Sequence, residues 1–293
     1  QVKIRYASTS LGVTCRLLGV TRQAHYKACK QQEKKMLQED VVLALVHEIR
    51  GKLPRLGGRK LYHMTKSDMK ANGLKIGRDR FFVILRDNGL LIKQRRNKMR
   101  TTHSYKWFNR YDNLIKGFQP TAPEQLWVSD ITYVRTLSGF KYLSLITDAF
   151  SRRIVGYHLA DDLGRAGCIN ALRMALKGAR DTHGLIHHSD RGSQYCSDEY
   201  TAMLTDNGAR ISMTQQYQPL DNPIAERING IVKGEFLETQ VLKDLEDTRE
   251  AVKVAVSKYN TLRPHLSLNM ETPNQIHFLL DNQQQDKLQL VNL

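Results

Sequence analysis

Three acidic side chains stand in contexts that suit the binding of metal ions. They are Asp130 in LWVSDITYV, Asp190 in IHHSDRGSQY and Glu226 in DNPIAERINGIVKGE. Carboxylate oxygens are the ligands that hard divalent cations prefer, and a pair of such cations can catalyse the cleavage and transfer of phosphodiesters. Asp and Glu are common residues, so the elements around them must decide whether these three meet in space.

The part of the chain that carries them alternates between strand-like and helix-like patterns. Three runs rich in β-branched and aromatic residues are followed by a helix, a short strand, a second helix and a last strand. They cover 126–136, 140–150, 152–161, 164–180, 184–190, 197–207 and 209–214. Asn222 and Pro223 are typical of the cap and the first position of another helix. This order predicts a mixed α/β sheet with helices on its faces.

The predicted sheet brings the three carboxylates within reach of one another. Asp130 lies midway along the first strand, Asp190 ends the fourth strand beside it, and Glu226 lies in the first turns of the following helix. A lone carboxylate in an apolar strand is costly to bury unless it is paired, which favours a shared site. The alternatives are a strand cap for Asp130, a turn residue for Asp190 and an exposed helix face for Glu226.

Positive charge is concentrated in the first part of the chain. Residues 1–120 contain 27 Lys and Arg against 8 Asp and Glu, whereas residues 121–293 contain 18 against 21. Such an asymmetry indicates a polyanionic partner, with nucleic acid the first candidate. A well-solvated basic domain and an anionic membrane surface are the alternatives. No apolar run approaches the roughly 18 residues of a membrane span, and Gln1 leads us to expect a processed or trimmed chain.

Two helical segments in the basic part are candidates for DNA binding. Residues 10–30 predict a helix, a turn at Gly19 and a second helix capped by Thr21, the pattern of a helix-turn-helix or of a short basic hairpin. Residues 39–50, a segment ending at Gly73, and 76–89 predict three further helices, a plausible second helix-turn-helix. The side chains suited to phosphates and base edges are Arg22, Gln23, His25, Tyr26, Arg59, Lys60, Arg78 and Arg80.

A strongly basic stretch, 93–107, follows these helices and includes Arg95, Arg96 and Lys98. It is either a solvated linker or an arm that follows phosphates. The four cysteines form no C-x-x-C pair, so we expect reduced thiols and no zinc site. His187 and His188 resemble metal ligands, but we expect one to pack in its strand and the other to face DNA.

The motifs together resemble a known family. W-x-S-D-I-T around Asp130, H-x-S-D-R-G-S-Q-Y around Asp190 and D-N-P-x-x-E-R-x-N-x-x-x-K around Glu226, with 35 residues between the last two acids, resemble the integrase catalytic core of bacterial insertion-sequence transposases. The similarity is to insertion-sequence family three, in its OrfB or OrfAB product, and covers about residues 8–278. Tyr259-Asn260, Arg263-Pro264-His265, Ser267-Leu268 and Thr272-Pro273 match its C-terminal signature.

The resemblance implies an RNase H-like fold preceded by all-helical modules, and the DDE mechanism. Asp130, Asp190 and Glu226 would bind two Mg²⁺ or Mn²⁺ ions, and Lys233, two helical turns after Glu226, would hold a phosphate. Arg191 and Arg263 are expected to contact DNA, although Tyr259, Asn260, Arg263 and His265 can equally pack the last helix. Asp148, at the end of the second strand, lies outside the family's triad.

We therefore expect a DNA transposase that binds terminal inverted repeats and then cleaves and transfers DNA strands. The expected domains are 1–36, 37–92, a linker 93–121, a catalytic core 122–240 and a helical extension 241–293. Its partners would be double-stranded DNA and a second copy of the chain on paired ends, with no membrane, in the bacterial cytoplasm near the nucleoid. The rivals are a DNA-binding regulator or domesticated transposase with an inactive core, and a structure-specific nuclease.

Overall fold

The contacts within the chain divide it into two units. The computed structural model describes residues 10–93, 111–215 and 222–279. Unit 1 contains residues 1–51 and 57–92, and unit 2 contains 52–56 and 93–293. The expected domain borders at residues 36 and 240 stay predictions.

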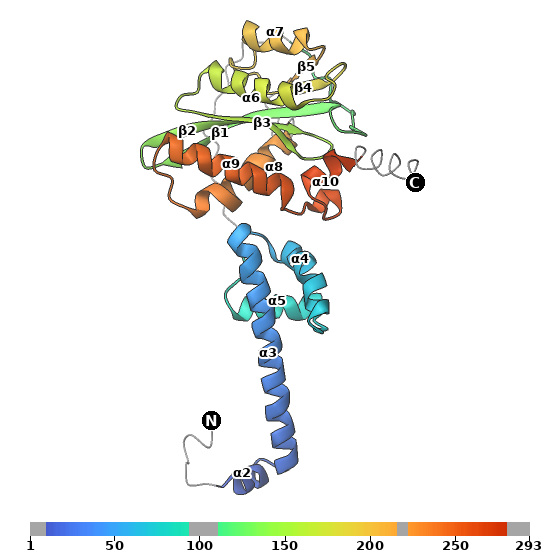
Figure 1. Cartoon of the computed structure of the whole chain (residues 1–293), viewed down its shortest axis with the longest axis vertical. Coiled ribbons are helices and arrows are strands. Elements are labelled where there is room, and N and C mark those ends of the chain that lie inside the picture. Colours follow the sequence, from blue (N-terminus) through green and yellow to red (C-terminus); the bar gives the residue numbers. More distant parts are fainter. Residues whose placement is uncertain (1–9, 94–110, 216–221, 280–293) are drawn as a thin grey trace, which may run out of the picture. The chain divides into compact units, whose positions relative to one another are not determined.

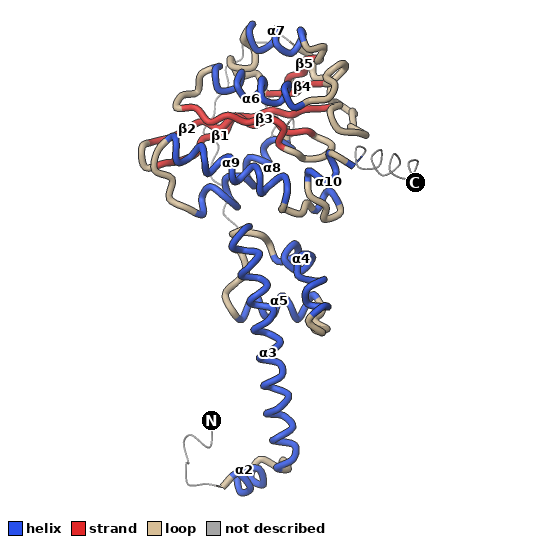
Figure 2. Tube along the Cα trace, in the orientation of Figure 1, coloured by secondary structure: helices blue, strands red, loops and turns tan. Residues whose placement is uncertain are grey.

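Unit 1 is helical, as the sequence predicts (Figures 1 and 2). Its helices are α2 (Leu11–Leu17), α3 (Arg22–Lys52), α4 (Gly58–Ala71) and α5 (Arg78–Asp87). Gly19 turns the chain between α2 and α3 with φ 66°, a conformation that favours glycine, and the Thr21 hydroxyl caps α3 by accepting from the Ala24 amide at 3.1 Å.

The expectation of two separate helices within 22–52 is wrong. α3 is continuous, because the residues between the two expected helices are the good helix formers QQEKKMLQ and neither Gly nor Pro interrupts them. The buried core of unit 1 is formed by Val42 and Val46 of α3 with side chains of α4 and α5: Leu61, Met69, Phe81, Ile84 and Leu85. Phe82, expected inside, is only half-buried.

Unit 2 is built on a five-stranded mixed sheet, and its expected fold class is confirmed. The strands are β1 (Leu126–Thr136), β2 (Gly139–Asp148), β3 (Ile154–Ala160), β4 (Ile186–Ser189) and β5 (Arg210–Met213), in the order β3-β2-β1-β4-β5. β1, β2 and β3 are antiparallel neighbours, whereas β4 runs parallel to both β1 and β5. β1 therefore lies at the centre, between the antiparallel and the parallel halves.

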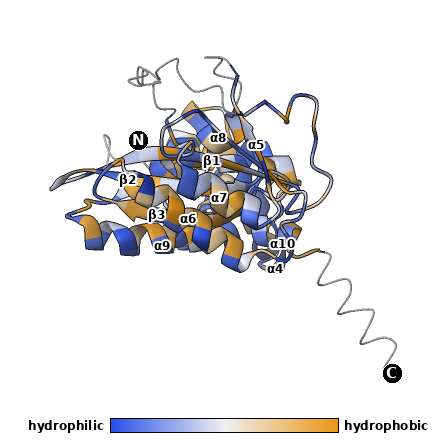
Figure 3. Cartoon of the chain, turned by 90° about the horizontal axis from the view of Figure 1, so that it is seen from above, coloured by the Kyte–Doolittle hydropathy of each residue, from blue (hydrophilic) through white to orange (hydrophobic). Residues whose placement is uncertain are grey.

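Helices cover both faces of this sheet (Figure 1). α6 (Arg165–Gly178) and α7 (Asp198–Asp206) lie on one face, and α8 (Pro223–Ile231), α9 (Leu245–Thr261) and α10 (Pro273–His277) on the other. α6 packs its apolar residues on the sheet (Figure 3), and at Gly156 any Cβ would come within 2.2 Å of the Ala171 carbonyl. α8 continues into a π-helical segment (Val232–Phe236) and a 3₁₀ turn (Leu237–Thr239).

Candidate active site

β1 and β4 bring the first two carboxylates together. The two strands pair only along Leu126–Val128, and Asp190 directly follows the last residue of β4. From Ser129 onward the edge of β1 that faces β4 is open, and Asp130 is the second residue of this open edge. Asn222 reaches the edge from the N-terminus of α8, where its side-chain amide donates to the Ser129 carbonyl at 2.9 Å.

α8 holds Asp130 and carries the third carboxylate. The Asn229 side-chain amide donates to Asp130 Oδ2 at 2.8 Å, and the Ile131 backbone amide donates to Oδ1 at 2.9 Å. Glu226 lies one turn before Asn229, in the first turn of α8, where the helix dipole favours a negative charge. The E-R-x-N spacing that the sequence displays therefore places a carboxylate and the amide that orients Asp130 on one helix, a role for Asn229 that sequence reasoning missed.

The three carboxylates interact electrostatically across the site. Burial, together with the negative charges of Asp190 and Glu226, raises the pKa of Asp130 to about 7, although the hydrogen bonds from Asn229 and Ile131 act in the opposite direction. Burial also raises the pKa of Asp190. The Gly192 amide donates to Asp190 Oδ1 at 2.9 Å, which favours the ionised form and acts in the opposite direction. Asp190 and Glu226 thus lie close enough to Asp130 for their charges to act on it, and the metal-binding role of the three residues stays a prediction.

The donor set suits hard divalent cations. The three carboxylates offer oxygen ligands, and the negative charges of Asp190 and Glu226 disfavour the ionised form of Asp130, a conflict that a bound cation would relieve. Within 10–93, 111–215 and 222–279, no three His, Cys, Asp or Glu side chains are arranged to enclose one ion. Mg²⁺ commonly binds through one or two carboxylates together with water and substrate phosphates, so the donor set still fits a site that substrate completes.

Lys233 lies on the π-helical segment that extends α8. Its ammonium nitrogen sits 4.1 Å from the centroid of the Tyr133 ring on β1. Tyr133 lies three residues beyond Asp130, so this cation lies beside the strand that carries Asp130. Arg191, which follows Asp190, is half-buried, and its buried Nε has no hydrogen-bond partner.

Asp148 and the two histidines of β4 are structural, in contrast to the triad. Asp148 is fully buried and accepts from the Glu124 amide and from the Ser151 amide and hydroxyl, each at 2.7 Å. His187 and His188 are also fully buried. His187 Nε2 bonds to the hydroxyls of Ser129 and Tyr200, and His188 Nδ1 to that of Ser212. The expectation that one of these histidines faces DNA is wrong.

The C-terminal signature packs the last helices against the sheet. The Asn260 side chain bonds both the amide and the carbonyl of Ile154 at 3.0 Å, and the Tyr259 hydroxyl bonds the Arg152 carbonyl and His265. Arg263 is 1% exposed and grips both oxygens of Glu235 at 2.7 and 2.6 Å. Of the two alternatives for this signature, the structure supports packing. The predicted DNA contact of Arg263 is not available in this conformation.

The other predicted DNA-binding residues are spread over unit 1. The exposed ones are Arg22, Gln23, Tyr26, Arg59, Arg78 and Arg80, while His25 and Lys60 are half-buried. Arg80 forms an ion pair with Glu39 and Arg78 one with Asp79. Arg95, Arg96 and Lys98 lie outside the described residues. None of the four cysteines forms a disulfide.

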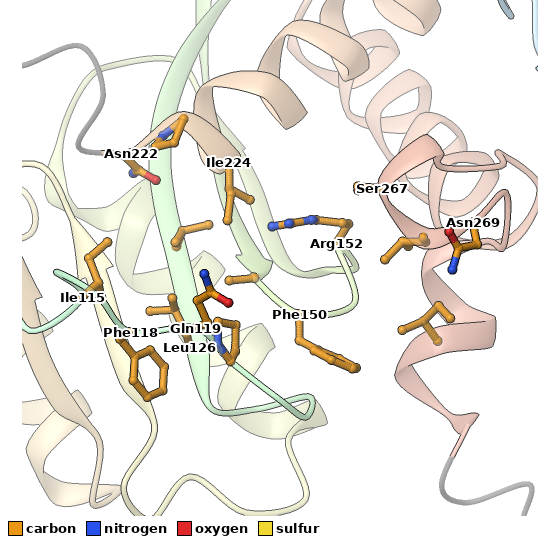
Figure 4. Close-up of a pocket in the computed structure, with 16 residues that line it drawn as sticks. Ile115, Phe118, Gln119, Leu126, Phe150, Arg152, Asn222, Ile224, Ser267 and Asn269 are labelled. Atoms are coloured by element: carbon orange, nitrogen blue, oxygen red, sulfur yellow. The ribbon is translucent and has the colours of Figure 1, made fainter.

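A cavity of about 650 Å³ lies beside the start of α8 (Figure 4). Its walls are mostly apolar and come from β1, the β2–β3 turn, α8 and the segment before α10. Arg152 is the only charged residue among them, and its Nη1 has no hydrogen-bond partner. None of the three carboxylates lines the cavity, so it is separate from the carboxylate cluster.

Comparisons with known proteins agree with this architecture. Two models of the integrase core domain match residues 120–219 and 207–273. The "Insertion element IS600 uncharacterized 31 kDa protein" of Shigella sonnei is 33% identical over 88% of this chain and 95% of its own length. "Transposase for insertion sequence element IS904" of Lactococcus lactis is 30% identical over 85% and 96%. "Transposase InsF for insertion sequence IS3A" of Escherichia coli is 29% identical over 88% and 91%.

Among solved structures, the catalytic core domain of HTLV-2 integrase in complex with magnesium is similar to this chain. It is 21% identical with a TM-score of 0.44, and the match covers 54% of this chain and 99% of that one.

The fold and the family models define a polynucleotidyl transferase with an integrase core domain, a class that depends on divalent metal in general. The chain belongs to the insertion-sequence family three transposases of the DDE superfamily. No helix in the described ranges is long and apolar enough to cross a membrane.

Proposed function

We propose that this transposase binds the terminal inverted repeats of its element and catalyses metal-dependent strand cleavage and strand transfer. The observation that carries the proposal is the arrangement around Asp130. Burial and two neighbouring carboxylates raise its pKa to about 7, although Asn229 and the Ile131 amide hold it as an acceptor. Such an electrostatic conflict is costly to retain unless a cation resolves it.

Asp130, Asp190 and Glu226 would hold two Mg²⁺ or Mn²⁺ ions. When bound, such a pair lowers the pKa of an attacking water or DNA 3′-hydroxyl and neutralises charge on the reacting phosphate. The chain's own residues fix the ligands: Asn229 and the Ile131 amide orient Asp130, and the Gly192 amide orients Asp190. Lys233 would bind a phosphate of the reacting strand.

Unit 1 would recognise the terminal repeats. Its Arg22, Gln23 and Tyr26 are exposed at the start of α3, and Arg59 and Arg78 are exposed near the starts of α4 and α5. Cationic side chains at helix starts suit phosphate contacts, and Gln suits base edges. Paired element ends would require at least two copies of the chain on DNA.

A cleavage and joining assay tests the proposal. Labelled duplex carrying the element's own terminal repeat is incubated with the protein and Mg²⁺, and nicked and joined products are separated. We expect both products, and neither with Glu226→Gln. Binding without cutting would support a regulator, cutting without joining would support a nuclease, and activity that survives Glu226→Gln would refute the assignment of the active site.

A further inference from the structure

Two aromatic side chains of the β1–β2 hairpin, on the strand that carries Asp130 and on its neighbour, are exposed to solvent. Tyr133 is 43% exposed and Phe140 is 54% exposed. Because Tyr133 pairs with Tyr142 and Phe140 with Arg135, the two rings are diagonal neighbours on one face of the hairpin. Their centroids are 5.5 Å apart and their planes meet at 82°, so Tyr133 and Phe140 brace each other edge to face.

The helix on this face leaves the pair uncovered. α6 reaches β2 at Gly167, where an added Cβ would lie 3.4 Å from the Ser144 hydroxyl. Phe140 lies four residues before Ser144, towards the tip of the hairpin. The hairpin tip is itself fixed, because the amides of Leu137 and Ser138 donate to the carbonyls of Leu242 and Lys243. The aromatic pair therefore stands on a rigid support and faces solvent.

Lys233 connects the pair to the carboxylates. By strand alternation, Tyr133 points to the face of the sheet opposite to Asp130, yet the Lys233 ammonium comes from the segment after α8 and lies 4.1 Å from the Tyr133 ring centroid. Lys233 therefore links the helical segment that follows Glu226 to the face of the hairpin that carries the two aromatic rings.

We propose that Tyr133 and Phe140 form a stacking site for a nucleobase next to the scissile phosphate, with Lys233 binding the adjoining phosphate. This inference rests on the proposed function. Proteins that hold single strands combine a cationic track with aromatic rings, and each stacked base accounts for a roughly 5- to 150-fold change in affinity.

The stacking site predicts that the base beside the cut is unpaired when DNA is bound. An aromatic ring reads the face of a base and no hydrogen-bonding edge, so the site would accept any base. A base drawn out of the duplex would also bring its phosphate to the open edge of β1, where Asp130 and Asp190 lie. The site would therefore position the strand for cleavage and leave sequence recognition to other parts of the chain.

Fluorescence of 2-aminopurine tests the stacking. The probe is placed at each of three positions on either side of the cleaved phosphate in terminal-repeat duplex, and the full chain carries Glu226→Gln so that the DNA stays uncut. We expect fluorescence at one position to change at least about twofold on binding, because the base leaves the duplex and stacks on the protein. Phe140→Leu and Tyr133→Leu should abolish the change, whereas Phe140→Tyr and Tyr133→Phe should retain it.

Controls separate a failure of this inference from a failure of the proposed function. Phe118→Leu removes another exposed aromatic ring of unit 2, which lines the cavity, and should leave the signal unchanged. Thermal melts check that each variant folds. If the wild type cuts DNA and the signal is the same in Phe140→Leu and Tyr133→Leu, the stacking site is refuted. If the wild type does not cut, the proposed function fails, whatever the fluorescence shows.

Discussion

Unit 2 contains two groups of acidic side chains that differ in their surroundings: one has hydrogen-bond and ion-pair donors, and the other has further negative charges. The carboxylates of Asp148 and Glu235 each have donors: Asp148 accepts three hydrogen bonds, although burial still raises its pKa, and Glu235 forms an ion pair with Arg263. Around Asp130 the nearest charges are two further carboxylates, and two hydrogen bonds do not offset them. Asp148 and Asp130 lie on the paired strands β2 and β1, with Asp148 opposite Trp127 and Asp130 opposite Leu145.

The difference separates a structural from a reactive carboxylate. A buried charge with satisfied hydrogen bonds stabilises the turn that it caps, whereas a cluster of like charges destabilises the fold until something else binds. Residue type does not distinguish the two cases, since Asp148 and Asp130 both end or interrupt apolar strands. What distinguishes them is the charge and the donors on neighbouring elements.

The largest expected effect comes from neutralising the uncompensated group. Asp130→Asn should lower strand cleavage by about 1000-fold or more, because a member of a catalytic set is lost. It should also raise the free energy of unfolding at pH 8 by about 1–3 kcal/mol, because a buried like charge is removed. Cleavage assays and denaturant melts measure the two quantities. A variant that loses both activity and stability would show that Asp130 is compensated after all.

The compensated group should respond in the opposite way. Asp148→Ala leaves the donors of Glu124 and Ser151 without an acceptor and should lower the free energy of unfolding by about 2–4 kcal/mol. Cleavage per folded molecule should change less than about threefold, since Asp148 lies outside the cluster. Active-site titration with DNA at a temperature where the variant stays folded gives this number. A large loss of activity in folded protein would place Asp148 in the chemistry.

The sequence predicts the layout of unit 2 well because each strand has its own local pattern. The bounds of β1, 126–136, are those of the expected strand, and Pro223 occupies the first turn of α8 as expected. Asn222 and Ser197 hold the cap positions, but their side chains bond the Ser129 and Gln194 carbonyls instead of the helix amides. Local propensity selects the residue type, and tertiary contacts decide which bond it makes.

For the candidate site, the sequence predicts only the residues that belong to recognisable motifs. Asp130, Asp190 and Glu226 are recognised by context, but the Asn229 bond to Asp130 and the Arg263 pair with Glu235 join segments far apart in sequence. The motif identifies Arg263 as a member of the C-terminal signature but leaves open whether it contacts DNA or packs the last helix. Its burial decides for packing. A sequence motif thus indicates that the cationic side chain of Arg263 is important. Only the fold shows whether such a side chain contacts DNA or forms an ion pair with a carboxylate.

Arg263 and Lys233 should differ in their effects on stability and on DNA binding. Arg263→Lys loses the two-pronged grip on a largely buried Glu235 and should lower the free energy of unfolding by about 1–3 kcal/mol. Lys233→Ala should leave stability within about 0.5 kcal/mol and reduce the slope of log affinity for DNA against log salt by about 1. Binding titrations from low to moderate salt give the slope. A reduced slope for Arg263→Lys, in protein shown to be folded, would contradict its structural role.

The smallest expected effect is the pH dependence of the free energy of unfolding that His277, beside Asp148 and Ser151, contributes. His277 is buried against Ser151, and burial, with help from Arg153 and Arg180, lowers its pKa to about 3. Between pH 6.5 and about 3 the unfolded chain therefore takes up a proton that the folded chain does not, so this histidine costs stability as the pH falls through that window. Raised carboxyl pKa values, as at Asp130, have the opposite sign and favour the fold as the pH falls.

Comparing His277→Asn with the wild type isolates this contribution. The difference in free energy of unfolding between the two proteins should move by about 1–2 kcal/mol in favour of the variant from pH 7.5 to pH 5. Asp130→Asn should shift in the other direction over the same range, because it removes a carboxyl that the folded state protonates more readily than the unfolded state. Denaturant melts at the two pH values measure both. Shifts of equal sign would contradict the opposite pKa shifts of His277 and Asp130 from which the prediction is drawn.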